Sequence, residues 1–214
     1  MKKNTKIIIG VLVLGVGLIA FLSMCYLMYK KNASLSRQHL VKAERLLYAN
    51  KTPEAVGELE KALAINPRND DAEMKLFDIY MKNSEYKQAE SMLQSQIKRA
   101  PDDFSNYVRR NKLAHVFITT NRITDAKKIY ESMLPKYSQG SGVYLGLSTC
   151  FEKEGDIAKA LEYQEKAITI MRNNPKFTPK AKLKKELQKL VELYSRSGQD
   201  DLVNKTNQEI VNIK

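Results

Sequence analysis

The sequence predicts an all-α protein in which one apolar N-terminal helix precedes a solenoid of about five helix-turn-helix repeats. Three observations support this fold class. The part after residue 30 is rich in Lys, Glu, Leu and Ala, which favour helices, and the whole chain has only 9 Gly, 6 Pro and no Trp. An uncharged apolar run lies near the N-terminus. Alanine-containing segments then recur at intervals of 34 residues.

The uncharged run Ile7–Met28 predicts a transmembrane helix. Its 22 residues would span about 33 Å as a helix, enough to cross a hydrocarbon core of roughly 30 Å. Lys30 and Lys31 close the run, and Tyr26 lies near its end, where interfacial aromatic residues are common. The N-terminal region therefore divides into three parts: a short basic tail at 1–6, a transmembrane helix at 7–28 and a linker at 29–35.

We expect the apolar helix to be an uncleaved signal-anchor. A short tail before a long apolar run favours a single-pass protein of a bacterial inner membrane with its solenoid in the periplasm, but similar numbers of basic residues flank the run, so the side stays open. A cleaved signal peptide, a lipoprotein signal at Cys25 and a buried core helix are the alternatives. Cleavage is disfavoured because signal peptides have apolar regions of about 7–15 residues and end in a small-x-small site.

The repeats are visible in the spacing of small residues. Ala55 and Ala89 are 34 residues apart, Ala126 follows 37 residues later and Ala160 after another 34. A weaker fifth copy places Val203 43 residues after Ala160. Each unit would be two helices that are marginal alone, so stacking against neighbours must stabilise them. The spacing predicts repeats at about 36–69, 70–103, 107–140, 141–174 and 181–214.

This pattern resembles the tetratricopeptide repeat family over residues 36–214. In that family an apolar residue, a small one and Tyr mark the first helix, and Ala, a large apolar residue, Ala and then Pro mark the second. The second repeat carries Leu76, Tyr80, Ala89, Leu93 and Pro101 in these places, although it has Phe77 where a small residue is usual and the early Trp is missing. The resemblance implies a right-handed α-solenoid. Left-handed turns between paired helices are expected at Asn50, Asn83 and Gly155.

The resemblance also implies a concave groove, lined by the first helix of each repeat, that binds a peptide or helix of another protein. The side chains at these positions are apolar with two carboxylates, which would suit a segment with apolar anchors and a basic residue. A simple core role for some of them is the alternative. The groove candidates are Leu40, Glu44, Leu47, Tyr48, Met74, Asp78, Met81, Asn111, His115, Ile118, Leu145 and Thr149.

A basic stretch follows the fourth repeat. Within a net charge of +12, it holds seven Lys or Arg residues against the single Glu186. A solvated helix face is the simplest interpretation, and contact with anionic lipid or an acidic partner is the alternative. Specific nucleic-acid binding is not expected, because stacking aromatic residues are sparse there. The basic patch comprises Arg172, Lys176, Lys180, Lys182, Lys184, Lys185 and Lys189.

The sequence offers no catalytic constellation, so we expect no enzyme activity. His39 and His115 stand in different repeats without a neighbouring cysteine or a ligand-spaced carboxylate, and Cys25 and Cys150 form no disulfide framework. We therefore expect no metal, no cofactor and no small-molecule substrate.

These observations lead to a functional hypothesis. The chain would be a membrane-tethered protein–protein interaction scaffold or adaptor that assists an envelope complex, with an unidentified protein as one partner and the lipid bilayer, through residues 7–28, as the other. The alternative is a secreted or lipid-anchored assembly factor for pilus or outer-membrane biogenesis after signal cleavage.

Overall fold

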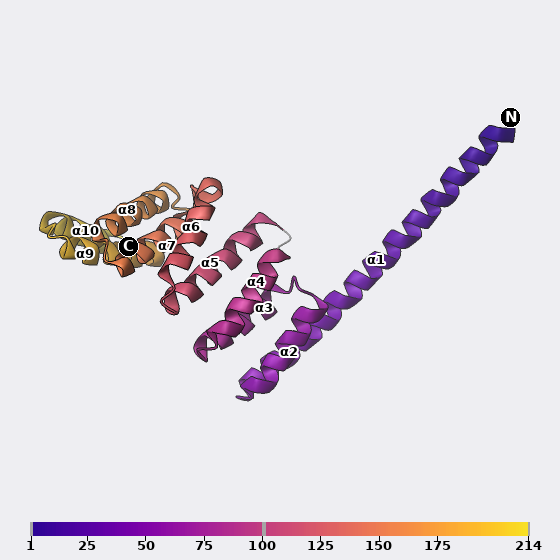
Figure 1. Cartoon of the computed structure of the whole chain (residues 1–214), viewed down its shortest axis with the longest axis horizontal. Helices are drawn as coiled ribbons and strands as arrows, with labels where there is room; N and C mark the ends of the chain where they lie inside the picture. Colours follow the sequence, from indigo (N-terminus) through magenta and orange to yellow (C-terminus); the bar gives the residue numbers. More distant parts are fainter. Residues whose placement is uncertain (1, 100–101, 214) are drawn as a thin grey trace. The chain divides into compact units, whose positions relative to one another are not determined.

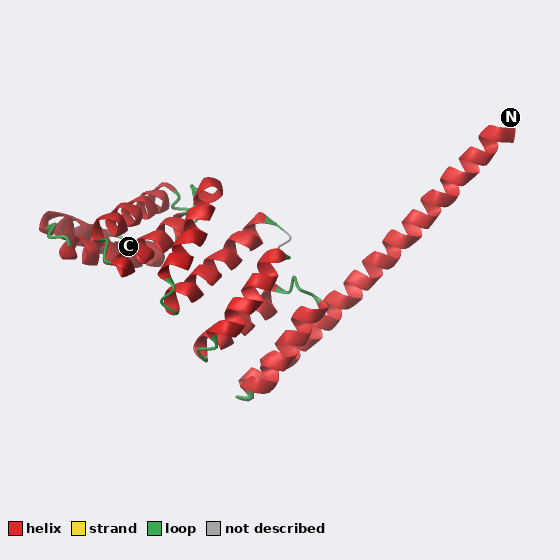
Figure 2. Cartoon of the chain, viewed as in Figure 1, coloured by secondary structure: helices red, strands yellow, loops and turns green. Residues whose placement is uncertain are grey.

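The computed structural model describes residues 2–99 and 102–213, with side chains from residue 15 onward, and the described residues contain ten α-helices and no strand (Figures 1 and 2). The prediction of an all-α fold is confirmed. The helices are α1 (Lys2–Tyr48), α2 (Thr52–Ile65), α3 (Asp70–Lys82), α4 (Tyr86–Lys98), α5 (Asp103–Thr119), α6 (Ile123–Tyr137), α7 (Ser141–Glu154), α8 (Ile157–Asn173), α9 (Lys180–Arg196) and α10 (Asp200–Asn212).

The chain forms two compact units, and the first, Met1–Glu85, contains α1, α2 and α3. The C-terminal part of α1 packs against α2, and α2 packs against α3. The paired helices α1 and α2 each bury an alanine completely, Ala43 and Ala55, which lets their backbones approach closely. Leu59 is also completely buried and fills the space beside them.

The helices α1 and α3 also lie side by side within this unit. Asn69 donates a hydrogen bond to Ser36 over 2.8 Å, and Lys75 forms an ion pair with Glu44 over 3.1 Å. The first pair is 33 residues apart and the second 31. Because the separation is nearly constant along both helices, α1 and α3 run parallel.

The second unit, Tyr86–Lys214, contains α4 to α10. Each of these helices packs against the next, and α5 also contacts α7. The predicted small positions are again completely buried: Ala89 in α4, Ala126 in α6 and Ala160 in α8. A first helix that touches both its partner and the first helix of the following pair is the arrangement expected of stacked helical repeats.

The helix–helix turns repeat one geometry. After α1, α3, α5, α7 and α9 the chain turns at a residue with positive φ, and these residues are Asn50 (57°), Ser84 (60°), Asn121 (59°), Gly155 (83°) and Gly198 (74°). In each turn the next residue donates its backbone N–H to the carbonyl five positions earlier, as Lys51 does to Leu46 over 2.8 Å. This is a Schellman motif. The prediction for Asn83 was wrong, because Asn83 has φ −83° and Ser84 takes the left-handed conformation.

The prediction of a membrane-spanning helix needs correction. Helix α1 is continuous through the expected linker at 29–35 (Figure 1). Its side chains from Val16 to Tyr29 are largely exposed. Among the residues whose side chains are described, no helix has an apolar stretch long enough to cross a membrane.

This finding concerns Gly15–Met28, the part of the predicted span whose side chains are described. Residues 7–14, the first part of the predicted span, lie outside the residues whose side chains are described. The predicted location, a single-pass inner-membrane protein with its solenoid in the periplasm, is contradicted by this finding.

A buried carboxylate links α1 to α2 in the first unit. One oxygen of Glu58 lies 2.6 Å from Nδ1 of His39, and the other accepts hydrogen bonds from Lys42 and Lys61, each over 3.0 Å. The bond to His39, followed by those to the two lysines, lowers the pKa of Glu58 to about 2. The ionised form is therefore the form that the folded unit favours.

Replacing Glu58 with Gln should make stability less sensitive to acid. Because the pKa of Glu58 is lower in the folded chain than its ordinary value of 4.5, the ionised carboxylate stabilises the fold above about pH 4.5 and this contribution is lost as the pH falls towards 2. We expect Glu58→Gln to unfold at a lower temperature than the wild type at pH 7, with a smaller further loss between pH 4.5 and pH 2.

Circular-dichroism melts across that pH range would measure the effect. Glu54→Gln is the matched control, because Glu54 lies exposed on the same helix and forms no ion pair within the described residues. Equal pH slopes for Glu58→Gln and the wild type would contradict this account.

Candidate peptide-binding surface

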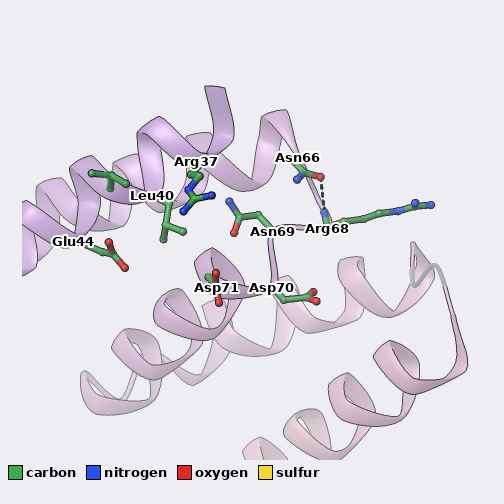
Figure 3. Close-up of a pocket in the computed structure, with 9 residues that line it drawn as sticks. Arg37, Leu40, Glu44, Asn66, Arg68, Asn69, Asp70 and Asp71 are labelled. Carbon is green, nitrogen blue, oxygen red and sulfur yellow. Dashed lines mark hydrogen bonds between the residues drawn. The ribbon is translucent and has the colours of Figure 1, made fainter. Parts of the chain in front are cut away.

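A pocket of about 600 Å³ lies in the first unit between α1 and the start of α3 (Figure 3). Figure 3 shows Arg37, Leu40 and Glu44 along one side of α1, with Asn69 opposite Arg37. The lining of the pocket is mainly polar, and Leu40 and Val41 are its two apolar members. Its lining residues are Arg37, Leu40, Val41, Glu44, Asn66, Arg68, Asn69, Asp70 and Asp71.

Two asparagines shape the connection between α2 and α3. Asn66 ends α2 in an extended conformation, and its side chain accepts a hydrogen bond from the backbone N–H of Arg68 over 3.1 Å. Asn69 caps α3 by accepting from the backbone N–H of Ala72 over 3.1 Å. The amide of Asn69 donates in turn to Ser36, whose hydroxyl donates to the carbonyl of Ala62 over 2.8 Å. This chain of bonds fixes the pocket wall against α1.

The rim of the pocket carries both signs of charge. Arg37 and Glu44 come from α1, and Asp70 and Asp71 come from the first turn of α3. Glu44 is already engaged by Lys75, whereas Asp71 forms no ion pair among the residues that the structure describes. The rim can therefore pair with a charged group without breaking an existing contact.

The predicted groove residues of the first unit divide into two sets. Leu40 is only 7% exposed and belongs to the core beneath the pocket, while Leu47 and Met81 are half-buried. The side chains open to solvent are Glu44, Tyr48, Met74 and Asp78, with Tyr48 at 94% and Met74 at 48% exposed. We use the name α1–α3 face for Arg37, Leu40, Val41, Glu44, Tyr48, Asp71, Met74 and Asp78.

The other predicted groove residues belong to the second unit. His115 is exposed, whereas Ile118 and Leu145 are half-buried. Asn111 donates to the backbone carbonyl of Tyr107 over 2.9 Å, and Thr149 accepts from Lys189 over 3.2 Å, so both polar groups already have partners. These five positions remain a prediction as a binding surface.

Sequence reasoning missed most of the pocket rim. Arg37, Asn66, Arg68 and Asn69 were not among the groove candidates, because three of them lie in the connection between helices and not on a first helix. The segment from Asn66 to Asp71, with two asparagines before two aspartates, does carry a capping signal. That signal predicts where α3 begins and says nothing of the contact with Ser36.

The predicted basic patch lies on α8, α9 and the connection between them. Two of its members are neutralised: Arg172 binds Glu209 with an Nε–Oε1 distance of 2.9 Å, and Lys189 binds Glu152 over 3.0 Å. Glu186, the single acidic residue of the stretch, accepts from Gln164 over 3.1 Å. The other five members are Lys176, Lys180, Lys182, Lys184 and Lys185, and none of them forms an ion pair within the described part of the chain.

The described residues contain no group of three or more His, Cys, Asp or Glu side chains placed to hold a metal ion. His39 is bound to Glu58. Cys150 is completely buried, and burial raises the pKa of its thiol to about 11, so the thiolate needed for nucleophilic chemistry is disfavoured at neutral pH.

Comparison with known proteins finds the tetratricopeptide repeat family twice, over residues 46–109 and over residues 141–174. No curated protein sequence matches the chain.

Solved structures share the fold at low sequence identity. The structure "MamA 41-end" from Desulfovibrio magneticus RS-1 superposes with a TM-score of 0.61 at 15% identity, covering 85% of this chain and 94% of that one. PilW, a type IV pilus biogenesis factor, has a TM-score of 0.60 at 18% identity, and the match covers 83% of this chain and 78% of PilW. YrrB, a tetratricopeptide repeat protein with an unusual peptide-binding site, has a TM-score of 0.52 at 14% identity, and the match covers 82% of this chain and 84% of YrrB.

Proposed function

Because the chain belongs to the tetratricopeptide repeat family, whose members serve as protein-interaction scaffolds, we propose that it binds a segment of another protein along the α1–α3 face of its first unit. The segment would lie across two parallel first helices, as the family resemblance implies. In this role the chain brings proteins together and carries out no reaction of its own.

The observation that carries the proposal is a pocket that contains two apolar side chains and has exposed apolar side chains on the same helices. Leu40 and Val41 are the apolar members of the lining, and Met74 and Tyr48 are exposed on α3 and α1. A large apolar side chain left open to water is common singly, but several around a concave site mark a binding surface. The partner would place one apolar anchor in this pocket.

The charges of the α1–α3 face favour a partner segment that also carries a basic residue. Asp71 and Asp78 lie two turns apart on α3, and both are exposed and without an ion pair in the described chain. A lysine or arginine placed beside the anchor would gain a charge-assisted hydrogen bond from either carboxylate. An acidic segment would meet Glu44, Asp71 and Asp78 with only Arg37 of the α1–α3 face to attract it, so it should bind more weakly than a basic one.

The solved structures support the proposal through the fold alone. YrrB shows that this helical architecture can carry a peptide-binding site, and PilW shows that it occurs in a factor for assembling a larger structure. The predicted repeat limits stay part of the same proposal. Helices α3 and α7 begin at Asp70 and Ser141, but α5 begins at Asp103, four residues before the predicted limit at 107.

A peptide array would test the proposal. The full chain is probed against short peptides in which one Leu anchor and one Arg are moved independently along a neutral sequence. Peptides that carry both should bind best, and Met74→Glu should weaken their binding about tenfold, or ~1.4 kcal/mol, because the Leu anchor would then cover a carboxylate in place of an apolar side chain.

The control variant is Phe104→Glu, which replaces an exposed apolar residue outside the first unit and should leave binding unchanged. The proposal fails if no peptide class is preferred, or if Met74→Glu binds the preferred peptides as tightly as the wild type does.

A further inference from the structure

The second unit has a separate pocket near its C-terminal end, formed by α8, α9, their connection and the end of α10. Its volume is about 480 Å³. Met171, Pro175, Leu183 and Ile213 give it an apolar lining, and Lys180 stands at its edge. Met171 is almost completely buried, whereas Leu183 and Ile213 are half-buried, so the apolar surface opens to solvent.

The charge around this pocket is mainly positive. Residues 166–185 contain seven Lys or Arg residues and no acidic residue. Lys166 and Arg172 have carboxylate partners on α8 and α10, but the five lysines between 176 and 185 form no ion pair within the described residues. The local positive charge is thus left uncompensated by the fold.

The helix geometry directs part of this charge to the pocket. Lys180 lines the pocket, and Leu183 and Lys184 follow three and four positions later on α9, which places them on the same face. Lys176 lies in the connection that supplies Pro175 and Thr178. An apolar recess is therefore bordered by at least two lysines, and it is adjacent in sequence to Phe177, whose side chain is 87% exposed.

We propose that this α8–α10 pocket binds an acidic polypeptide segment, with one bulky apolar side chain of the segment in the recess and its carboxylates on Lys176, Lys180 and Lys184. Charge complementarity selects the acidic partner. The recess selects a polypeptide over a flat anionic surface, because only a protruding side chain reaches Leu183 and Ile213. Nucleic acid fits poorly, since Phe177 is the single aromatic residue between Arg172 and Leu193.

This site does not depend on the α1–α3 face. The two pockets have lining residues in different units, and they prefer opposite charges in their ligands. A scaffold with two such sites can hold a basic segment and an acidic segment at once. If binding at one site is disproved, the proposal for the other site is unaffected. The variants described below distinguish binding at the two sites.

Fluorescence anisotropy on the full chain provides the test. The probes are two labelled peptides that share the same flanking Asp and Glu residues and differ only in a central Leu or Ser. We expect the Leu peptide to bind at least tenfold more tightly than the Ser peptide, and both to weaken as salt rises.

Two variants assign the binding to the pocket, and two others serve as controls. The double variant Lys180→Glu/Lys184→Glu should weaken both peptides at least tenfold, whereas Leu183→Ser should weaken the Leu peptide and leave the Ser peptide unchanged. Lys128→Glu is the matched control, because Lys128 is an exposed lysine on α6, and it should have no effect. Met74→Glu should also leave both affinities unchanged.

Circular-dichroism melts establish that each variant is folded before binding is compared. Equal affinities for the Leu and Ser peptides would overturn the proposal, because the recess would then play no part. An equal loss in Lys128→Glu, or displacement of the Leu peptide by phosphatidylserine vesicles at lower concentration than by unlabelled peptide, would overturn it as well.

Discussion

Replacing Gly146 with alanine should lower the free energy of unfolding by about 1–3 kcal/mol, the usual cost of overpacking a core. A Cβ atom at this position in α7 would lie 2.2 to 2.5 Å from three ring atoms of Tyr130. Tyr130 comes from α6 and is only 5% exposed. Because the ring is buried, the added methyl group must either displace it or separate the two helices.

Gly57→Ala is the matched control for this prediction. Gly57 also lies inside a helix, α2, but a Cβ atom there would meet nothing within 4 Å. Alanine should therefore stabilise the chain by about 0.5–1 kcal/mol through its higher helix propensity. Urea unfolding followed by circular dichroism measures both changes, and opposite signs are expected. A Gly146→Ala variant as stable as the wild type would show that the contact with Tyr130 relaxes at no cost.

Truncating Leu59 to alanine should destabilise the first unit by about 2–5 kcal/mol, the range for a completely buried leucine. Leu59 is 0% exposed and lies in α2, which packs against both α1 and α3. Removing its isobutyl group leaves a cavity that these neighbours can close only in part. Because this core is small, we expect a clear fall in the urea midpoint.

Leu35→Ala supplies the comparison for Leu59→Ala. Leu35 lies on α1 and is 39% exposed, so the same substitution should cost less than about 1 kcal/mol. Hydrogen exchange can then assign the loss, since amides of α2 should lose protection in Leu59→Ala and keep it in Leu35→Ala. Similar losses of stability in both variants would rule out the packing argument.

The helical repeats could be predicted from the sequence because their signal is periodic. The repeated small positions from Ala55 to Val203 are separated by 34, 37, 34 and 43 residues. The residues with positive φ are separated by the same four intervals, and they are Asn50, Ser84, Asn121, Gly155 and Gly198. Small residues recur where backbones must approach, and a left-handed residue recurs where each pair must turn. The one-residue error at Asn83 arose because asparagine is the commoner left-handed residue, while the register of the turn places Ser84 there.

The candidate site could be predicted only in part, because it depends on contacts between residues far apart in the sequence. Position along a first helix correctly marked Glu44 and Met74 as exposed, but it marked Leu40 in the same way, and Leu40 is buried. The polar wall of the pocket rests on Asn69 reaching Ser36, 33 residues earlier. No periodicity in either segment encodes that bond.

The five turns share one hydrogen-bond pattern, and this pattern has a kinetic consequence. Each closes with hydrogen bonds that span only a few residues, so bringing two helices together there requires little loop closure. Contacts formed in this way are local, and proteins dominated by local contacts fold in microseconds to milliseconds. Folding can begin at any hairpin and spread to its neighbours, so the earliest helices can associate while the rest of the chain is still leaving the ribosome.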